Sequence, residues 1–328
     1  MTSTQRKHMR RFAAAILVPT AACAVLAGCG SSGSSTPNSN ASVKVSGTFD
    51  KTPSVTIPKA TASTNLVVAT PIKGTGAALA SGSTALANIA VYKWSGKTHS
   101  LVDSTFGAGP QMIPAQMGLP GLTTALKDAK VGSRIVAVLP PKYGYGTSGQ
   151  SQLQITGKDT LVWVIDLLQQ YTSTQAATGS QVSNGGGGLP TVAATAGQAP
   201  VVTVPKATAP TKLSVTTLIK GTGPALVKGD TAVTQYVGVN WRTGKAFGSS
   251  WPTAQGAGGL LSFQVGGTQV LTGLSNGLVG VPVGSRVMLV IPPALGYGPA
   301  GGQASAGITK TDTLVFVVDV LGSAPAGS

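Results

Sequence analysis

The stretch LVIPPALGYG, residues 289–298, ends a run of apolar residues with two prolines and then holds a tyrosine between two glycines. Prolines cannot donate ladder hydrogen bonds, so the strand that the apolar run predicts must end there and a loop must begin. The glycines permit a tight bend, which leaves the ring of Tyr297 projecting from it. The stretch therefore predicts a strand and a corner, whose tyrosine either packs as a structural residue or faces a site.

The corner occurs twice, because AVLPPKYGYG at residues 137–146 has the same shape. Other stretches recur in the same order: VTIPKAT at 55–61 as VTVPKAT at 202–208, IKGTG at 72–76 as IKGTG at 219–223, Trp94 as Trp241, and DTLVWVIDLL at 159–168 as DTLVFVVDVL at 312–321. A duplication explains this repeat. It predicts two domains of one architecture.

Within each copy the periodicity is mainly that of strands. In the second copy the runs at 231–241, 285–293 and 312–321 are alternating or β-branched and have strand length. Only residues 268–280 and their counterpart in the first copy place leucines at the spacing of one helical face. These leucines are Leu119, Leu122 and Leu126 in the first copy and Leu271, Leu274 and Leu278 in the second. The pattern predicts an α+β fold in which each domain packs an antiparallel sheet on one short helix.

The composition excludes several classes of chemistry. The chain has no glutamate and only 8 Asp against 23 Lys and Arg, so chemistry with paired carboxylates has little to draw on. The net charge of +15 is spread along the chain without a basic stripe of interleaved aromatics, which argues against a nucleic-acid partner. His8 and His99 have no neighbours for metal or triad chemistry. We expect no metal and no cofactor, and a surface that faces anionic polymers of the cell envelope.

The first residues have the pattern of an export signal. A basic start, Arg6 to Arg11, precedes a short apolar core, and the tetrapeptide LAGC ends at Cys29. LAGC is similar to the lipobox of bacterial lipoproteins, in which the cysteine is lipidated and becomes the first residue of the mature protein. The alternative is a plain secretory signal that happens to contain two cysteines. The first interpretation predicts a lipid anchor at Cys29 on the extracytoplasmic face of the cell membrane.

Two polar stretches set the expected domain boundaries. Their Gly, Ser and Asn content buries too little apolar area to order itself, which predicts a flexible tether and a flexible linker. We therefore divide the chain into a signal peptide at 1–28, a tether at 29–49, a first domain at 50–171, a linker at 172–199, a second domain at 200–322 and a tail at 323–328.

Five stretches of the second copy together resemble one known family. VTQYVG, TGKAFGSSW, LSFQVGGTQVLTGL, LVIPPALGYG and DTLVFVVD occur in the order and at about the spacing of FKBP-type peptidyl-prolyl isomerases. The resemblance covers residues 200–322 well and residues 50–171 in weaker form. It implies a curved antiparallel sheet wrapped around one short helix, with an apolar pocket between them.

The resemblance also implies the pocket residues of the second copy. The pocket-lining phenylalanine of the strand before the helix falls on Leu261 or Phe263. The other family positions fall on Tyr236, Phe247, Val270, Leu271, Leu274, Tyr297 and Phe316. Two family features are absent, because Gly248 stands in place of an acidic residue and Leu274 in place of a tryptophan that commonly forms the pocket floor.

These residues suffice for the family's chemistry. Rotation about a prolyl amide needs no nucleophile, acid or metal, and an apolar pocket with little water favours the twisted, less dipolar amide. By resemblance, the backbone N–H of Leu271 and the hydroxyl of Tyr297 hold the substrate carbonyls. The implied partners are proline-containing polypeptides and macrolides such as tacrolimus or rapamycin.

The first copy lacks part of this set. Ile89 stands in place of Tyr236, Val102 in place of Phe247 and Leu122 in place of Leu274, while Tyr145, Trp163 and Asp103 remain. We interpret this copy as mainly structural or weakly binding. Two hypotheses for the chain stay open: an extracytoplasmic isomerase that assists folding of secreted proteins, active mainly through the second copy, or a non-catalytic binding lipoprotein.

Overall fold

The structure is a computed structural model that describes residues 42–253 and 258–326. The expected signal peptide, Cys29 and most of the expected tether lie outside the described residues. The chain divides into two compact units, one built mainly from residues up to Leu168 and one mainly from Gln169 onward. Among the residues described, no helix is long and apolar enough to cross a membrane.

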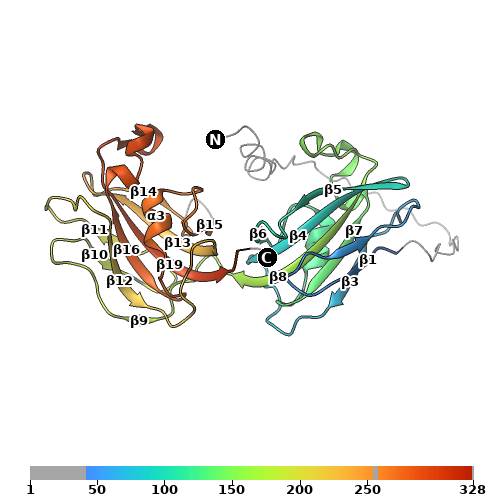
Figure 1. The fold of residues 1–328 in the computed structure, drawn as a ribbon, viewed down its shortest axis with the longest axis horizontal. Helices are drawn as coiled ribbons and strands as arrows, with labels where there is room; N and C mark the ends of the chain where they lie inside the picture. The colour runs from blue at the N-terminus through green and yellow to red at the C-terminus, as the bar shows by residue number, and fades with distance from the viewer. Residues whose placement is uncertain (1–41, 254–257, 327–328) are drawn as a thin grey trace, which may run out of the picture. The chain divides into compact units, whose positions relative to one another are not determined.

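The second copy is built on a sheet of seven strands. Its order is β14-β13-β19-β16-β12-β9, with β15 paired to β13. The strands are antiparallel to their neighbours. They are β9 (Ser180–Gln181), β12 (Ser214–Lys220), β13 (Thr231–Asn240), β14 (Ala246–Ser249), β15 (Leu261–Gln264), β16 (Arg286–Ile291) and β19 (Leu314–Ala324). A short helix, α3 (Thr272–Gly277), packs on β16 and lies against the sheet in Figure 1.

The first copy has a sheet of six strands in the order β3-β7-β8-β4-β5, with β6 paired to β4. These strands are β3 (Val67–Ile72), β4 (Thr84–Ser95), β5 (Thr98–Ser104), β6 (Gln111–Pro114), β7 (Arg134–Leu139) and β8 (Thr160–Tyr171). Its helix is α2 (Pro120–Leu126). Each copy is thus mostly β-structure with one short α-helix among the described residues, as the periodicity predicted, and short 3₁₀ helices follow each Pro-Pro corner.

The central strands are buried on both faces, which explains why β16 and β19 are mostly apolar, apart from Arg286 in β16 and Asp319 and Ser323 in β19. On one face an inner cluster is formed by Phe263, Leu274, Leu289, Phe316 and their buried neighbours. On the other face an outer cluster is formed by Trp241, Trp251, Met288, Val317 and theirs. α3 covers the inner cluster, so the outer cluster needs a different cover.

Part of the segment for which composition predicts a flexible linker supplies that cover. Within residues 172–199, β9 extends the main sheet and β10 (Thr191–Ala193) pairs with β11 (Val201–Thr203). Leu189 and Val192 pack against the outer cluster. The few apolar residues of this segment are ordered by the sheet face on which they lie, and composition alone does not reveal that contact.

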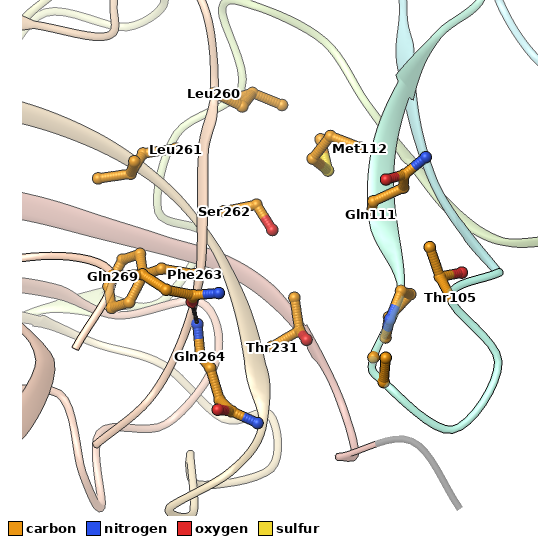
Figure 2. Close-up of a pocket in the computed structure, with 13 residues that line it drawn as sticks. Thr105, Gln111, Met112, Thr231, Leu260, Leu261, Ser262, Phe263, Gln264 and Gln269 are labelled. Carbon is orange, nitrogen blue, oxygen red and sulfur yellow. Dashed lines mark hydrogen bonds between the residues drawn. The ribbon is translucent and has the colours of Figure 1, made fainter. Parts of the chain in front are cut away.

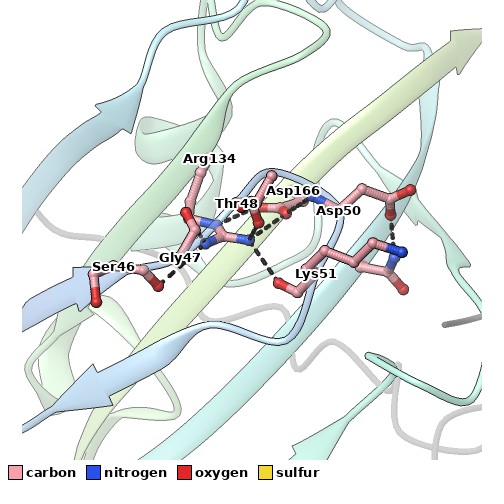
Figure 3. A network of polar contacts seen from close by, with 8 residues as sticks. Ser46, Gly47, Thr48, Asp50, Lys51, Arg134 and Asp166 are labelled. Atoms are coloured by element: carbon pink, nitrogen blue, oxygen red, sulfur yellow. Dashed lines mark hydrogen bonds and ion pairs between the residues drawn. The ribbon is translucent and has the colours of Figure 1, made fainter.

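A hairpin also precedes the sheet of the first copy. β1 (Lys44–Ser46) lies within the expected tether and pairs with β2 (Ser54–Thr56). The chain between them binds a buried ion pair in which Arg134 Nε lies 2.7 Å from Asp166 Oδ1 (Figure 3). The Arg134 guanidinium also donates to the carbonyls of Ser46, Gly47, Thr48 and Lys51. The tether therefore ends in ordered structure several residues before the expected boundary.

The second copy repeats this ion pair. Arg286 Nε lies 2.5 Å from Asp319 Oδ1, and the backbone N–H of Ala177 donates to Asp319 Oδ2 at 2.9 Å. In both copies the arginine opens the strand after the helix and pairs in register with an aspartate of the last strand. Each pair is shielded from water, so it depends on the hydrogen bonds that the preceding segment provides.

Candidate functional site

Three aromatic rings from three neighbouring strands meet at the edge of the inner cluster. The Phe316 ring centroid lies 5.8 Å from that of Tyr236 and 5.5 Å from that of Phe247. The ring planes of Phe247 and Phe316 are inclined by 73°. This is the edge-to-face arrangement that aromatic pairs prefer. Tyr236 and Phe247 are only partly buried, so the group has an apolar surface that can contact a ligand.

Gly238 makes this arrangement possible. Gly238 lies on β13, where it pairs with Phe316 of β19 on one side and with Gly248 of β14 on the other. A Cβ atom at Gly238 would lie 2.6 Å from the ring of Phe247, closer than van der Waals contact allows. The ring of Phe247 therefore occupies the space that a side chain at position 238 would fill. No sequence pattern singled out Gly238, although the family motif VTQYVG contains it.

The start of α3 faces the same cluster. Val270 and Leu271 pack against it from their half-buried positions, and Leu274 is buried within it. Leu271 caps the helix, so its backbone N–H is not used by the hydrogen bonds of the helix itself. Gly273 lets the helix approach β16 closely, since a Cβ atom there would lie 2.4 Å from Ile291 Cγ2.

Tyr297 reaches the group from the corner after β16. Tyr297 and Tyr236 are both partly buried and pack against the inner cluster. Burial raises the pKa of the Tyr236 hydroxyl, and the Tyr297 hydroxyl raises that pKa further. Tyr236 is consequently a neutral hydrogen-bond donor over the whole physiological range.

Both candidates for the pocket-lining position before the helix, Leu261 and Phe263, lie on β15, and they differ in exposure. Figure 2 shows Leu261 and Phe263 directed to one side of the strand and Ser262 to the other. Phe263 is only 3% exposed, whereas Leu261 is half-buried against the same cluster. The strand end is held by a hydrogen bond of 2.7 Å from the backbone N–H of Gln264 to Gln269 Oε1. Phe263 thus supports the site from the core, and Leu261 is the side chain that a ligand could contact.

The position of the missing acidic residue lies beside a tyrosine hydroxyl. A Cβ atom at Gly248 would lie 3.4 Å from Tyr236 Oη. An acidic side chain would fit there and could accept a hydrogen bond from Tyr236. With glycine in this place, Tyr236 keeps its hydroxyl available, and the site carries no charged group at this point.

The equivalent region of the first copy is filled differently. Val91, which is buried, takes the place of Gly238 and pairs with Asp103, while Val102 takes the place of Phe247. Ile89 and Leu122 are completely buried. The side chain of Val91 occupies the room that Gly238 leaves for an aromatic ring. The first copy therefore lacks the ring trio and instead has a packed aliphatic core.

Trp163 stands in the first copy where Phe316 stands in the second. It is buried, and none of the described residues accepts a hydrogen bond from its Nε1. Burial raises the pKa of Tyr145, the counterpart of Tyr297. Nowhere in the described part of the chain do three His, Cys, Asp or Glu side chains gather as a metal site requires.

Comparison with known proteins agrees with this geometry. The family model of FKBP-type peptidyl-prolyl cis-trans isomerases matches residues 89–168 and 223–321. The chain belongs to this family. It is an isomerase of the FKBP type, and each copy contains one matched segment.

Several FKBP relatives match over about one copy. The FK506-binding protein of Streptomyces anulatus is 37% identical over 122 residues, which span 37% of this chain and 94% of that protein. A probable FK506-binding protein of Corynebacterium glutamicum is 35% identical over 123 residues, which span 37% of this chain and 96% of that protein. Among solved structures, FkpA from Escherichia coli is 38% identical with a TM-score of 0.30, over 35% of this chain and 49% of that one.

Proposed function

We propose that the second copy, residues 200–322, is the catalytic part of the chain and rotates prolyl peptide bonds of polypeptides outside the cytoplasm. The observation that carries this proposal is the group of Tyr236, Phe247 and Phe316 at the edge of the inner cluster. Among the described residues, the first copy has no such group, because Ile89 replaces Tyr236 and Val102 replaces Phe247. Catalysis needs a surface that binds a proline ring, and only the second copy offers this one.

The site would act by holding the prolyl amide in an environment that suits its twisted form. The planar amide is stabilised by resonance, and its rotation barrier in water is about 18–20 kcal/mol. A proline ring placed among the three aromatic rings loses water, which favours the less dipolar twisted amide. The N–H of Leu271 and the hydroxyl of Tyr297 would donate to the neighbouring carbonyls. Each ~1.4 kcal/mol of preference for the twisted amide gives a factor of ten in rate.

Phe247→Ala in the full chain tests this assignment, with Val102→Ala as its matched control in the first copy. We expect Phe247→Ala to lower kcat/KM in a peptide isomerisation assay by tenfold or more, because it opens one wall of the site to water. Val102→Ala should leave kcat/KM unchanged. Loss from Val102→Ala alone would assign the activity to the first copy, and equal loss from both variants would mean that both copies contribute; either result would contradict the proposal.

The alternative function is binding of proline-containing chains without catalysis. Gly248 and Leu274 favour it, since the family's acidic residue and pocket-floor tryptophan are both absent. An intact chain that binds a proline-containing peptide but does not accelerate its isomerisation would establish this alternative. The assay therefore includes a binding measurement with the same peptide.

We further propose that the second copy binds FK506 or rapamycin. Two relatives carry FK506 binding in their names, and the aromatic group offers the apolar surface that such a macrolide needs. Leu274 gives less flat contact area than an indole, so Leu274→Trp should tighten binding in a calorimetric titration. A lack of binding by both forms would mean that the pocket is closed to macrolides.

The proposed location is the extracytoplasmic face of the cell membrane. A basic start, a short apolar core and LAGC at residues 26–29 support a lipid anchor on Cys29. Cys29→Ser should move the protein from the membrane fraction to the soluble fraction. Membrane association that persists in this variant would exclude the lipid anchor.

A further inference from the structure

The first copy contains a pocket on the sheet face opposite its aliphatic core. The pocket has a volume of about 400 Å³ and is lined by residues 61–64, Trp94, Gly96, Pro140, Pro141, Lys142, Lys158 and Thr160. Trp94 follows the side-chain alternation of β4 that places Ile89 and Val91 on the other face. The lining contains none of the residues that correspond to the isomerase site. Its size is that of a pocket for a small ligand.

The floor of this pocket is apolar. The indole N–H of Trp94 is already used, since it donates to the carbonyls of Ala60 at 2.9 Å and Gly96 at 3.1 Å. Trp94 is only 2% exposed, so it forms the buried base of the pocket, and the little surface that it offers is carbon. Ala62, Pro140 and Pro141 have no polar side-chain atoms. A ligand would have to bring an apolar body to match this floor.

The rim of the pocket carries positive charge without a carboxylate among its lining residues. Lys142 and Lys158 are both exposed and both line the pocket. The ammonium of Lys142 lies 4.8 Å from the centroid of the Tyr143 ring, a cation–π contact that holds it near the corner. The nearest acidic side chain in sequence, Asp159, accepts hydrogen bonds from Ser95 and Thr156. The two ammonium groups are therefore available to an anion.

The second copy retains the frame of this pocket but not the two lysines at its rim. Trp241 corresponds to Trp94, and its indole N–H donates to Ala207 as that of Trp94 does to Ala60. The same Pro-Pro corner follows, but Ala294 replaces Lys142 and Thr311 replaces Lys158. The aspartate of this region, Asp312, is bound by Arg242. The pair of lysines is a feature of the first copy alone.

We propose that this pocket binds a carboxylate carried on an aromatic or branched apolar body. The apolar body would lie over the buried Trp94 and contact the partly exposed Ala62 and Pro141, and the carboxylate would accept hydrogen bonds from Lys142 and Lys158. A free small molecule and the C-terminal carboxylate of a polypeptide share this chemistry. Such a site would give the first copy a binding role, although this copy lacks the three aromatic rings of the second copy.

The four tryptophans of the chain provide a direct readout by NMR of their indole N–H groups. In a titration of the full chain with 4-phenylbutyrate, the Trp94 resonance should shift and saturate, while that of Trp241 stays in place. The uncharged 4-phenylbutyramide should bind at least tenfold more weakly. Equal shifts of Trp94 and Trp241, or equal binding of acid and amide, would overturn the proposal.

Two substitutions borrowed from the second copy test the lysines. Lys142→Ala and Lys158→Thr should each weaken binding of 4-phenylbutyrate at least tenfold, because each removes a charge-assisted hydrogen bond. Both positions are exposed, and unchanged resonances of Trp163 and Trp241 would verify that the variants are folded. Unchanged affinity in both variants would refute the site.

A pair of peptides distinguishes the two sources of the carboxylate. Ala-Ala-Phe with a free carboxyl group and its C-terminal amide contain no proline, so neither is an isomerase substrate. If the free peptide shifts Trp94 as strongly as 4-phenylbutyrate does and the amide does not, the occupant is a polypeptide C-terminus. If 4-phenylbutyrate alone shifts Trp94, the occupant is a free small carboxylate. Both outcomes support the site, and absence of any shift with all three ligands would reject it.

Discussion

Gly238 and Phe247 form a complementary pair, and the first copy has exchanged both members. A glycine on β13 leaves room for a large ring from the neighbouring strand, since a Cβ atom at Gly238 would lie 2.6 Å from that ring. In the first copy, Val102 is too short to fill the space that the Phe247 ring occupies in the second copy. The side chain of Val91 fills that space instead. Both arrangements fill the same space, but only that of the second copy leaves an aromatic surface for a substrate.

Gly238→Val should therefore remove activity from the second copy. The added side chain must displace the Phe247 ring, so we expect kcat/KM to fall at least tenfold and the free energy of unfolding to fall by about 1–3 kcal/mol. Peptide isomerisation and urea denaturation measure the two effects.

The double variant Gly238→Val with Phe247→Val copies the pair of the first copy and serves as the control. It should recover most of the stability while activity stays low. Recovery of activity in the double variant would show that the Phe247 ring is not a wall of the site.

Asp312 gives a pH-dependent contribution to the stability of the second copy. Hydrogen bonds from the Arg242 guanidinium, together with its charge, hold the pKa of Asp312 well below its usual range. A carboxylate whose pKa is lowered on folding contributes stability above its unfolded pKa of about 3.9, and this contribution is lost as the pH falls toward the folded pKa.

Asp312→Asn should consequently lower Tm at pH 7 and lose that difference between pH 4 and pH 2. Thermal unfolding at a series of pH values measures the effect. Asp230→Asn is the control: Asp230 is half-buried beside a turn of the same copy and accepts a hydrogen bond from the Val227 backbone N–H, so this variant should change Tm little at either pH. A difference between Asp312→Asn and the parent chain that is as large at pH 2 as at pH 7 would contradict the ion-pair explanation.

At the scale of elements, a strand or helix can be predicted from the sequence where its own residue pattern determines which of its faces are buried. The predicted strands at 231–241, 285–293 and 312–321 correspond to β13, β16 and β19, whose short β-branched runs between turn residues suit strands buried in a sheet. The predicted helix at 268–280 corresponds to the shorter α3, which begins after the cap residue Leu271. These elements are confirmed.

Elements that depend on a distant partner could not be predicted in the same way. β9 and β10 arise in a Gly- and Ser-rich segment because they pair with β12 and β11 and lie by the outer cluster. The choice between Leu261 and Phe263 likewise depends on which side chain α3 covers. The buried Arg–Asp pairs require the register of two strands far apart in sequence, and no local pattern reveals that register.

The buried pair Arg134–Asp166 connects three elements of the first copy. Arg134→Leu would leave Asp166 buried without a counter-charge and would release the carbonyls of Ser46, Gly47, Thr48 and Lys51. Breaking one partner of such a pair costs about 3–5 kcal/mol. We expect Arg134→Leu to lower the free energy of unfolding by that amount in urea denaturation followed by tryptophan fluorescence.

The double variant Arg134→Leu with Asp166→Leu separates charge from packing. Removal of both charges should restore at least half of the lost stability, since no buried charge is then left unpaired. A double variant as unstable as the single one would mean that the contacts to the preceding hairpin, and not the ion pair, hold this region together.

For the whole molecule, the structure indicates that each copy extends further toward the N-terminus than composition suggests. The segment before the second copy brings the Ala177 N–H to Asp319 and places Leu189 and Val192 on the outer cluster. The segment before the first copy brings four carbonyls to Arg134. Each preceding segment is therefore expected to belong to the folding unit that follows it, and a domain boundary at residue 200 would cut through one unit.

A comparison of fragments 172–326 and 200–326 tests this expectation. The shorter fragment loses β9 with its pairing to β12, two half-buried apolar side chains, the pairing partner of β11 and one hydrogen bond to Asp319. From these losses we expect its free energy of unfolding to be about 2–4 kcal/mol lower. The aromatic trio lies on the opposite face, so kcat/KM should be the same in both fragments at temperatures where both are folded.

Fragments 42–171 and 50–171 repeat the comparison in the first copy, where the shorter one loses β1 and three of the carbonyls that bind Arg134. Equal stability within both pairs of fragments would show that these segments behave as linkers after all, whereas a lower kcat/KM for fragment 200–326 would mean that the outer cover also shapes the site.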